Sequence, residues 1–354
     1  MHYIKKDFVP DYQNIVDAAS NKIPKRTPLY EHIIDGRIFS IVTGEDLGMY
    51  DTGDYRRDYT AHFRRVQHAF MSLGYDAMCY EIGSGGAFPG ANALGGHVAG
   101  VVTDRASYDK FPWDKVAGRF FDYAAKNYDC ARDAELPGMK LIGGVANGIF
   151  ENVQNIVGLT DLCYIKLDDP ELYGLIFEKV GAILYDIWDQ FLDRWDDIFC
   201  VYRFGDDLGY KLSPMLSPDD IRKHIIPQYK KIIGLIKRKT GKPFLLHSCG
   251  NIFSVMDDII DAGIDAKHSN EDVIAPFSEW IDRYNDRIGL FGGIDTDALC
   301  DVSGIDIESY MEERVKPLIG HRGVAIGSGN SITSYVSPER YAKANEMIRR
   351  YRGE

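Results

Sequence analysis

The segment Ser217–His268 reads SPDDIRKHIIPQYKKIIGLIKRKTGKPFLLHSCGNIFSVMDDIIDAGIDAKH and contains two consecutive helix–strand units. Ser217–Lys239 predicts a helix, because its serine can cap the N-terminus and its proline suits the first helical position. The apolar run Pro243–His247 follows as a strand. Ile252–Ala262 predicts a second helix, which a glycine stops, and Ile264–His268 predicts the next strand. Strands separated by helices indicate right-handed βαβ units and a parallel sheet.

The same alternation extends over the whole chain of 354 residues. Further helical patterns cover Tyr59–Leu73, Pro170–Trp195 and Ser337–Arg350. The expected strands are Pro28–Ile34, Asp76–Ile82, Met139–Val145, Ile198–Phe204, Pro243–His247, Ile264–His268, Ile288–Ile294 and Gly323–Gly327. Eight such units close into a barrel of about 250 residues plus insertions.

We therefore expect an α/β fold, a single (β/α)₈ TIM barrel over residues 26–354 preceded by an N-terminal extension, residues 1–25. The active site is expected at the C-terminal ends of the strands. The alternative is a doubly wound open sheet, which would need a Gly-x-Gly-x-x-Gly turn after an early strand. The glycines within Gly83–Gly86 and Gly90–Gly100 do not have that spacing.

Composition restricts the class of partner. The formal net charge is −12, and basic residues are not concentrated, which argues against nucleic acid. No run of about 18 apolar residues is long enough for a membrane span, and Met1–Pro10 does not resemble a secretory signal. The six cysteines are spread through a large chain, so we expect free thiols and a cytoplasmic protein.

Ionisable and amide side chains follow most of the expected strands. Any one of them could be an ordinary turn residue or helix cap, but a ring of such groups at strand ends favours an active site. These residues are Glu31, His32, Glu81, Asn147, Asp206, Asp207, His247, Cys249, His268, Glu271, Asp295 and Asn330.

His247 and Cys249 are the strongest metal-ligand candidates. A strand delivers both with one residue between them, and imidazole with thiolate suits Zn²⁺. The alternative is a hydrogen-bonded core histidine beside an inert cysteine. Asp206 and Asp207, flanked by glycines, can bind a cation or move protons, or can form an acidic turn and cap. Glu81 is a single acid at a strand end.

The long glycine-rich segment Gly83–Gly100 is either a lid over the site or an ordinary loop. Several aromatic residues near the expected site loops, among them Tyr210, could form a flat apolar pocket, although core packing explains most aromatic residues in any barrel.

The chain resembles the uroporphyrinogen decarboxylase superfamily, and within it the corrinoid-dependent methyltransferase branch. The resemblance runs from about Arg26 to the C-terminus. It rests on the segments Arg26-Thr27-Pro28, Gly205-Asp206-Asp207-Leu208-Gly209 with Ser217-Pro218, His247-Ser248-Cys249-Gly250, Phe291-Gly292-Gly293-Ile294-Asp295, Gly327-Ser328-Gly329-Asn330-Ser331-Ile332 and Ser337-Pro338-Glu339. The family's fold is a (β/α)₈ barrel, in agreement with the strand count.

Two departures from the family pattern matter. Decarboxylases of the family carry an early arginine-rich run for the carboxylates of the porphyrinogen, whereas this chain has Tyr30–Arg37 in its place. The thiol methyltransferases hold zinc with His-x-Cys and a second cysteine, whose place is taken here by Asn330. A zinc site in this chain therefore needs an oxygen ligand, with Glu81, Asp206, Asp207 and Glu271 as the candidates.

The resemblance implies a methyltransferase that moves a methyl group between a small substrate, favoured to be an aromatic methyl ether, and the cobalt of a partner corrinoid protein. The alternatives are a methylcobamide:thiol or folate methyltransferase, a decarboxylase, or a non-catalytic partner of a corrinoid protein. We expect Glu81, Asp206, Asp207 and Asn330 to be catalytic and His247 and Cys249 to bind Zn²⁺, with Glu81 or Glu271 as a further ligand. The residues expected to bind substrate are His32, Asn147, Tyr210, His268 and Asp295.

Overall fold

The computed structural model describes residues 4, 5, 7–96 and 98–354. Met1–Tyr3 and Lys6, in the expected N-terminal extension, and His97, in the segment interpreted as either a lid or an ordinary loop, lie outside the described residues. Seven strands form the sheet of the described chain, all parallel and in sequence order. They are β1 Ala77–Gly83, β2 Lys140–Ala146, β3 Phe199–Gly205, β4 Phe244–His247, β5 Ala266–His268, β6 Gly289–Ile294 and β7 Val324–Ser328.

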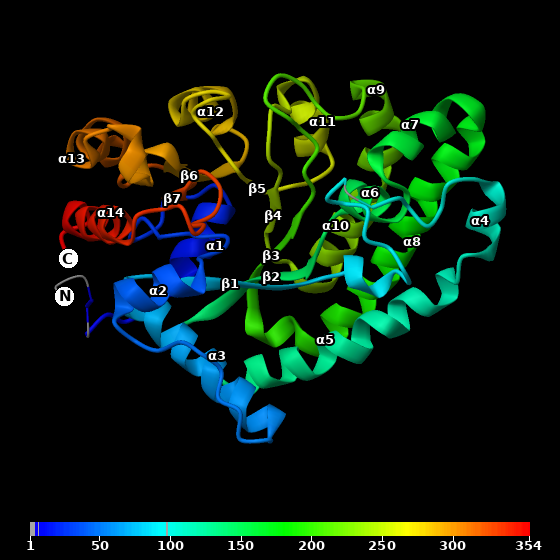
Figure 1. The fold of residues 1–354 in the computed structure, drawn as a ribbon. Coiled ribbons are helices and arrows are strands. Elements are labelled where there is room, and N and C mark those ends of the chain that lie inside the picture. Colours follow the sequence, from blue (N-terminus) through cyan, green and yellow to red (C-terminus); the bar gives the residue numbers. More distant parts are fainter. Residues whose placement is uncertain (1–3, 6, 97) are drawn as a thin grey trace.

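Helices lie around the outside of these strands (Figure 1). They are α1 Gln13–Ala19, α2 Gly36–Thr43, α3 Tyr55–Ser72, α4 Arg105–Lys110, α5 Val116–Asp133, α6 Ile149–Val157, α7 Leu159–Asp168, α8 Pro170–Trp195, α9 Pro218–Asp220, α10 Ile226–Thr240, α11 Met256–Asp261, α12 Phe277–Tyr284, α13 Ile307–Tyr310 and α14 Pro338–Tyr351. The helix expected over Ser217–Lys239 is divided by a π-helical turn, Ile221–Ile225. Across the described residues, we find no helix with the length and apolar character of a membrane span.

The expectation of eight strands is wrong, because the first run, Pro28–Ile34, does not form a regular strand. It makes an isolated parallel bridge to β7, between Leu29 and Ile326. One rung further on, the Ser328 amide donates to the side chain of Glu31 (2.9 Å) and not to a backbone carbonyl of the run. The carboxyl group of Glu31 thus takes the place of a backbone acceptor at this rung of the ladder. In the described residues no strand pairing joins this run to β1, which leaves a seam between them.

The sheet nevertheless curls around an interior of its own. One buried cluster takes side chains from all seven strands, from the first run and from α1. Its members are Ile15, Ala18, Ala19, Tyr30, Ala77, Ile142, Cys200, Val201, Leu245, Ala266, Phe291 and Ala325. Since α1 contacts β3, β6 and β7, it closes the end at which the strands begin, which we call the base. The strands end at the opposite edge, which we call the mouth.

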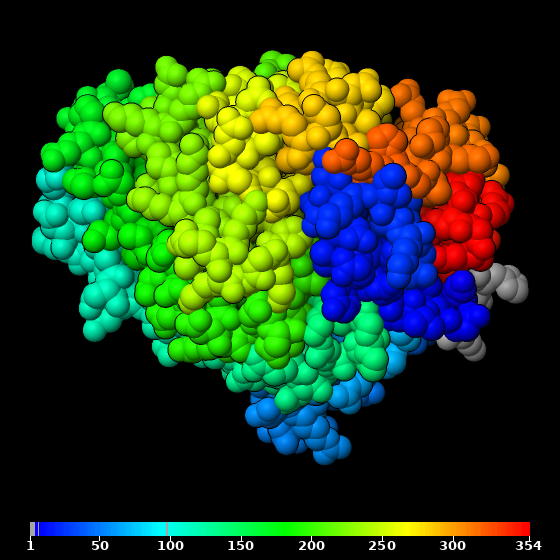
Figure 2. Space-filling view, turned by 180° about the vertical axis from the view of Figure 1, so that it is seen from behind, coloured from blue at the N-terminus to red at the C-terminus, as the bar shows by residue number. Residues whose placement is uncertain are grey.

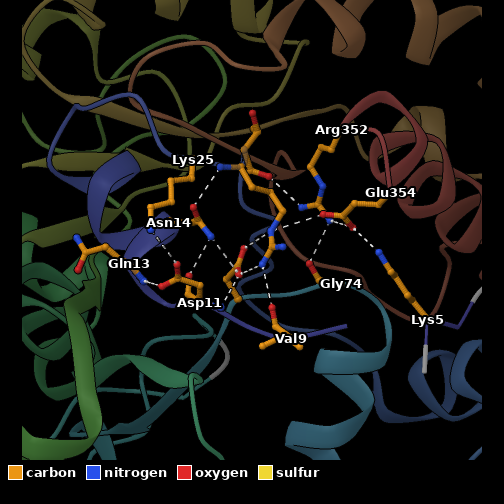
Figure 3. Close-up of polar contacts among 12 residues, drawn as sticks. Lys5, Val9, Asp11, Gln13, Asn14, Lys25, Gly74, Arg352 and Glu354 are labelled. Carbon is orange, nitrogen blue, oxygen red and sulfur yellow. Dashed lines mark hydrogen bonds and ion pairs between the residues drawn. The ribbon is translucent and has the colours of Figure 1, made fainter. Parts of the chain in front are cut away.

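A network of charged and amide groups holds the base together (Figure 3). Asp76, directly before β1, accepts hydrogen bonds from the Asp11 amide (2.8 Å) and from the Asn14 side chain (3.3 Å), and it pairs with Arg26. Glu354 pairs in turn with Arg26 (3.6 Å). The network therefore joins the N-terminal segment to the C-terminal end of the chain, which lie together on the surface in Figure 2.

Candidate functional site

Asp207, His247 and Cys249 bring one ligand atom each to a single place at the mouth. These three atoms lie within 4.8 Å of one another. The Cys249 Sγ atom is 3.4 Å from His247 Nε2, and Asp207 Oδ1 is 3.8 Å from the same nitrogen. Zinc–ligand bonds of about 2.0–2.3 Å in a tetrahedron place the ligand atoms about 3.4–3.6 Å apart. The donor set and its spacing fit a zinc ion, and three protein ligands leave a fourth position open, as in catalytic zinc sites.

Two loops that are distant in sequence hold this arrangement. Asp207 Oδ1 accepts a hydrogen bond from the Cys249 amide (2.8 Å), so the first loop orients the second. The backbones touch at Gly209 and Gly250: a Cβ on Gly250, whose φ is +81°, would lie 2.2 Å from the Gly209 carbonyl carbon. Both motifs therefore need glycine for close approach of the main chains.

Burial, reinforced by the charge of Asp207, raises the pKa of the Cys249 thiol to about 12. The thiol is therefore protonated before a metal binds, and a bound ion would displace that proton. Burial also lowers the pKa of His247 well below its ordinary value, with His32 and Arg203 acting in the same direction. A neutral imidazole is the form that binds a metal.

Asn330 and Glu271 lie beside the three ligand atoms. The Asn330 side-chain nitrogen donates to Glu271 Oε1 (2.7 Å) and to Cys249 Sγ (3.4 Å). The amide thus turns its donor, and not its oxygen, toward the thiol. Asn330 supports the cysteine, while Glu271 lies outside the described group of three ligands.

Asp206 and Asp207 face different surroundings although they are adjacent. Asp206 is fully buried and accepts hydrogen bonds from the Tyr229 hydroxyl (2.6 Å) and from the amides of Phe150 (3.1 Å) and Glu151 (2.8 Å). These amides belong to the first turn of α6, so Asp206 caps that helix from another element. Burial raises the pKa of Asp206 to about 6, against the opposing effect of these hydrogen bonds.

Glu151, in the first turn of α6, is an acid that the sequence analysis missed. Burial and the nearby charges of Asp206 and Asp207 raise the pKa of Glu151 to about 8. Its carboxyl oxygens accept from the Asn147 side chain (2.8 Å) and from the Asp207 amide (3.3 Å). The signal was present: Asn147-Gly148 follows β2 and the helix starts at once, so an acid in its first turn lies close to the strand end.

Glu81 pairs with a buried arginine. Arg203, on β3, has no exposed surface; it forms an ion pair with Glu81 and donates from Nη2 to His32 Nε2 (3.2 Å). The His32 ring lies 4.4 Å from the His247 ring, between centroids. Glu81 and His32 therefore meet next to the ligand group without joining it. Arg203 was missed as well, although a charged residue inside an apolar strand is a signal of a buried pair.

The remaining expected residues lie in different places. His268 contacts His247 through their Nδ1 atoms (2.8 Å). The two carboxyl oxygens of Asp295 accept from the amides of Asp272 and Asp297, at 2.7 Å each, so this residue shapes its loop. Tyr210 is 67% exposed at the rim of the mouth. Of the residues assigned to substrate binding, His268 and His32 contact His247 of the ligand group, and Asn147 donates to Glu151.

A cavity of about 510 Å³ opens at the seam between the first run and β1. Its walls are mostly apolar, with polar groups supplied by two histidines, a thiol, Glu81 and Asn147. It is lined by His32, Ile33, Ile34, Gly36, Phe39, Leu47, His62, Val66, Phe70, Cys79, Tyr80, Glu81, Gly83, Ala146 and Asn147. Because the run and β1 do not pair, space for a small molecule exists beside His32; His247 does not line this cavity, but its ring contacts that of His32.

A family model and one of the solved structures compared agree with this architecture. The family model described as uroporphyrinogen decarboxylase (URO-D) matches residues 95–351. Among solved structures, a methyltransferase from Methanosarcina mazei superposes with a TM-score of 0.67 at 15% identity, covering 95% of this chain and 97% of that one. A glycoside hydrolase family 5 enzyme from Prevotella bryantii reaches a TM-score of 0.47 at 11% identity, with 96% and 99% covered. No curated protein matches the chain.

Proposed function

This chain belongs to the uroporphyrinogen decarboxylase family, and we propose that it is a metal-dependent methyltransferase of the corrinoid branch. It would move a methyl group between a small substrate and the cobalt of a separate corrinoid protein. The observation that carries this proposal is the group Asp207, His247 and Cys249, whose ligand atoms lie within 4.8 Å of one another at the mouth. The similarity to a methyltransferase supports it at the level of the fold.

We propose that these three residues hold Zn²⁺. When bound, zinc supplies Lewis acidity toward a substrate oxygen. With Asp207 in place of a second thiolate, the donor set is harder than one with two thiolates, which favours an oxygen substrate over a thiol. His247 and Cys249 hold the ion on the β4 side, and Asp207 completes the set from the loop after β3.

The favoured substrate is an aromatic methyl ether bound in the seam cavity. Aromatic and aliphatic side chains, among them Phe39, Phe70 and Tyr80, supply most of its walls. No lysine or arginine lines this cavity in the described residues, and the Glu81 carboxylate is paired with Arg203. An uncharged ring therefore fits better than a multiply anionic porphyrinogen, which needs counter-charges.

Cleavage of the ether leaves an electron pair on the substrate oxygen, which must then take up a proton. Glu151 is the acid that we propose for this step, because its raised pKa keeps it protonated at neutral pH. It lines a second cavity of about 260 Å³ that shares Asn147 with the seam cavity. Arg203 and Glu81 would hold His32 against His247, and so keep the cavity wall in place.

The test combines metal analysis with a methyl-transfer assay. We expect about one Zn²⁺ per chain in the wild type. Cys249→Ser should lower zinc affinity on the order of 10²–10³-fold, since binding free energy is shared among few ligands. The transfer of methyl from methoxyarenes to reduced cobalamin, followed by cobalt absorbance, should be lost with it.

Cys163→Ser is the matched control, because Cys163 is an exposed free thiol on α7. It should keep both zinc and activity. Equal zinc content in the wild type and Cys249→Ser would contradict the metal site. If thiols accept methyl readily while no methoxyarene donates one, the metal site stands and the ether substrate is wrong.

A further inference from the structure

Behind the proposed metal ligand His247 lies a chain of two further residues, on strands β5 and β7. The His268 ring contacts His247 through the two Nδ1 atoms (2.8 Å), and its Nε2 lies 3.0 Å from the Ser328 carbonyl oxygen. His268 is completely buried, so neither solvent nor a substrate reaches it. Strands β4 and β5 are neighbours in the sheet (Figure 1), and His247 and His268 are partners in their register.

The direction of the hydrogen bonds that link Ser328, His268 and His247 follows from the Ser328 carbonyl group, whose role is fixed. A carbonyl oxygen can only accept, so the Ser328 contact requires a proton on His268 Nε2. A neutral imidazole carries one proton, which leaves a lone pair on His268 Nδ1. That lone pair can accept only if His247 carries its own proton on Nδ1.

The consequence concerns Nε2, the second ring nitrogen of His247. With its proton on Nδ1, the ring has its lone pair on Nε2, the atom that faces Cys249 Sγ at 3.4 Å and Asp207 Oδ1 at 3.8 Å. We infer that His268 is a positioning residue: together with the Ser328 carbonyl it fixes the tautomer and the orientation of His247, and thereby prepares Nε2 to bind the metal. Its role in metal binding rests on the proposed function, whereas the arrangement of protons does not.

The packing around His268 supports a fixed ring. Tyr30 contacts it edge-on at 4.9 Å between centroids, so rotation would break the contact. Arg203 and Lys267 both disfavour the protonated form of the ring, and among the described residues no carboxylate pairs with it. Histidine ligands in metal sites commonly donate their second nitrogen to such a partner, and loss of the partner typically costs 10–100-fold in metal affinity.

The experiment compares two variants of His268. His268→Phe keeps a planar ring but removes the acceptor, so we expect zinc affinity, measured by competition with a chromogenic chelator, to fall about 10–100-fold. His268→Asn places a carbonyl oxygen near the former Nδ1 position and should bind zinc within about threefold of the wild type, because an amide oxygen accepts as the imidazole did.

His224→Phe is the control. His224 is a partly buried histidine that packs on Tyr173 and Phe177, and it has no contact with the ligand group. Zinc affinity in this variant should equal that of the wild type. Thermal melts of all variants identify any affinity change that comes from unfolding.

A second measurement needs neither a variant nor a metal. Nitrogen-15 correlation spectra of the metal-free wild type should show His247 protonated on Nδ1 and His268 on Nε2. A proton on His247 Nε2 would overturn the inference, as would unchanged zinc affinity in a folded His268→Phe. If the wild type binds no zinc yet shows these tautomers, the proton arrangement stands and the proposed metal site fails.

Discussion

Both ends of the curled sheet bury charged groups, but these groups differ in how completely their hydrogen bonds and charges are paired. At the base, the Asp76 carboxylate accepts from the Asp11 amide, the Asn14 side chain and Arg26. At the mouth the central arginine is less completely paired: Arg203 Nε and the neighbouring His32 Nδ1 are buried and have no hydrogen-bond partner among the described residues, as is also the case for Arg352 Nε at the edge of the base. A buried polar atom without a partner costs free energy, so a protein retains one only for a reason.

The difference shows how this fold divides its tasks. In barrels of parallel strands, the end at which the strands begin serves stability and the end at which they finish serves chemistry. The base joins segments from both ends of the sequence through paired charges. The mouth collects thiol, imidazole and carboxyl groups that are incompletely paired, next to a cavity. Substitutions at the base should therefore change unfolding, and substitutions at the mouth should change binding.

The largest change in stability is expected at the base, for Asp76→Asn. Arg26, which is a quarter exposed, would lose the nearer of its two charged partners and keep Glu354, and removal of one member of a fully buried pair costs about 3–5 kcal/mol, which sets the upper limit here. Zinc content and methyl transfer should stay at wild-type values in the protein that remains folded. Denaturant unfolding, with zinc analysis at a temperature well below the transition, would measure both.

Asp261→Asn is the matched control, because Asp261 pairs with Arg287 on the surface at 3.0 Å. Exposed pairs contribute about 0–1 kcal/mol. If Asp76→Asn costs no more than this control, the base does not have the stabilising role assigned to it.

A smaller, pH-dependent change is expected for Glu31→Gln. Glu31 is buried, and burial raises its pKa from the ordinary 4.5 to about 8 against the two hydrogen bonds from Ser328. The folded state therefore holds a proton that the unfolded state releases above pH 4.5. The stabilisation is complete below that pH and is lost as the pH rises toward 8.

Glutamine resembles the protonated acid, so Glu31→Gln should remove this dependence. Relative to the wild type, we expect the variant to gain up to about 1.4 kcal/mol per pH unit between pH 5 and 7. Unfolding curves at a series of pH values would show it. Glu279→Gln, on a surface i,i+4 pair, is the control. Parallel curves for Glu31→Gln and the wild type would mean that Glu31 is ionised in the folded state.

The sequence predicted the seven strands, five of the helical segments and two residues of the candidate site, because these depend on local patterns; it did not predict others, such as the long helix α5. Alternation of apolar runs and helical periods places the seven strands and the long helix Pro170–Trp195, which has the expected bounds. His247 and Cys249 follow from their spacing at one strand end, and the family model confirms the family. The third member of the candidate ligand group could not be chosen among several acids, because the direction of Asp207 depends on its contact with the Cys249 amide, 42 residues away.

The other features that the sequence did not predict also depend on contacts between distant residues. The first run has a strand composition, but the side chain of Glu31 takes the place of a backbone acceptor at one rung of its ladder, and no periodicity shows that. Arg203 and Glu151 acquire their roles from partners brought close by folding: Glu81 and His32 for the arginine, and two aspartates for the glutamate. Patterns along the chain predict which residues reach the mouth, but not which of them face each other there.

The smallest change in stability separates two neighbours at the mouth, Asp206 and Asp207. Asp206 resembles the groups of the base, since its oxygens accept from Tyr229 and from two amides of α6. Asp206→Asn keeps one acceptor oxygen and presents an amide to a donor. We expect it to lower the free energy of unfolding by about 1 kcal/mol, the typical cost of a lost helix cap, while zinc affinity changes little.

Asp207→Asn should give the reverse result. Its carboxylate is partly exposed, so stability should stay within about 0.5 kcal/mol, as for most surface substitutions. Zinc affinity should fall on the order of 10²-fold, because a neutral amide is a weaker ligand than a carboxylate. Unfolding curves and chelator competition on both variants decide the matter. If Asp206→Asn loses zinc while Asp207→Asn only loses stability, the two aspartates have the opposite roles. The number of hydrogen-bond partners of a buried group would then not predict whether that residue serves stability or binding.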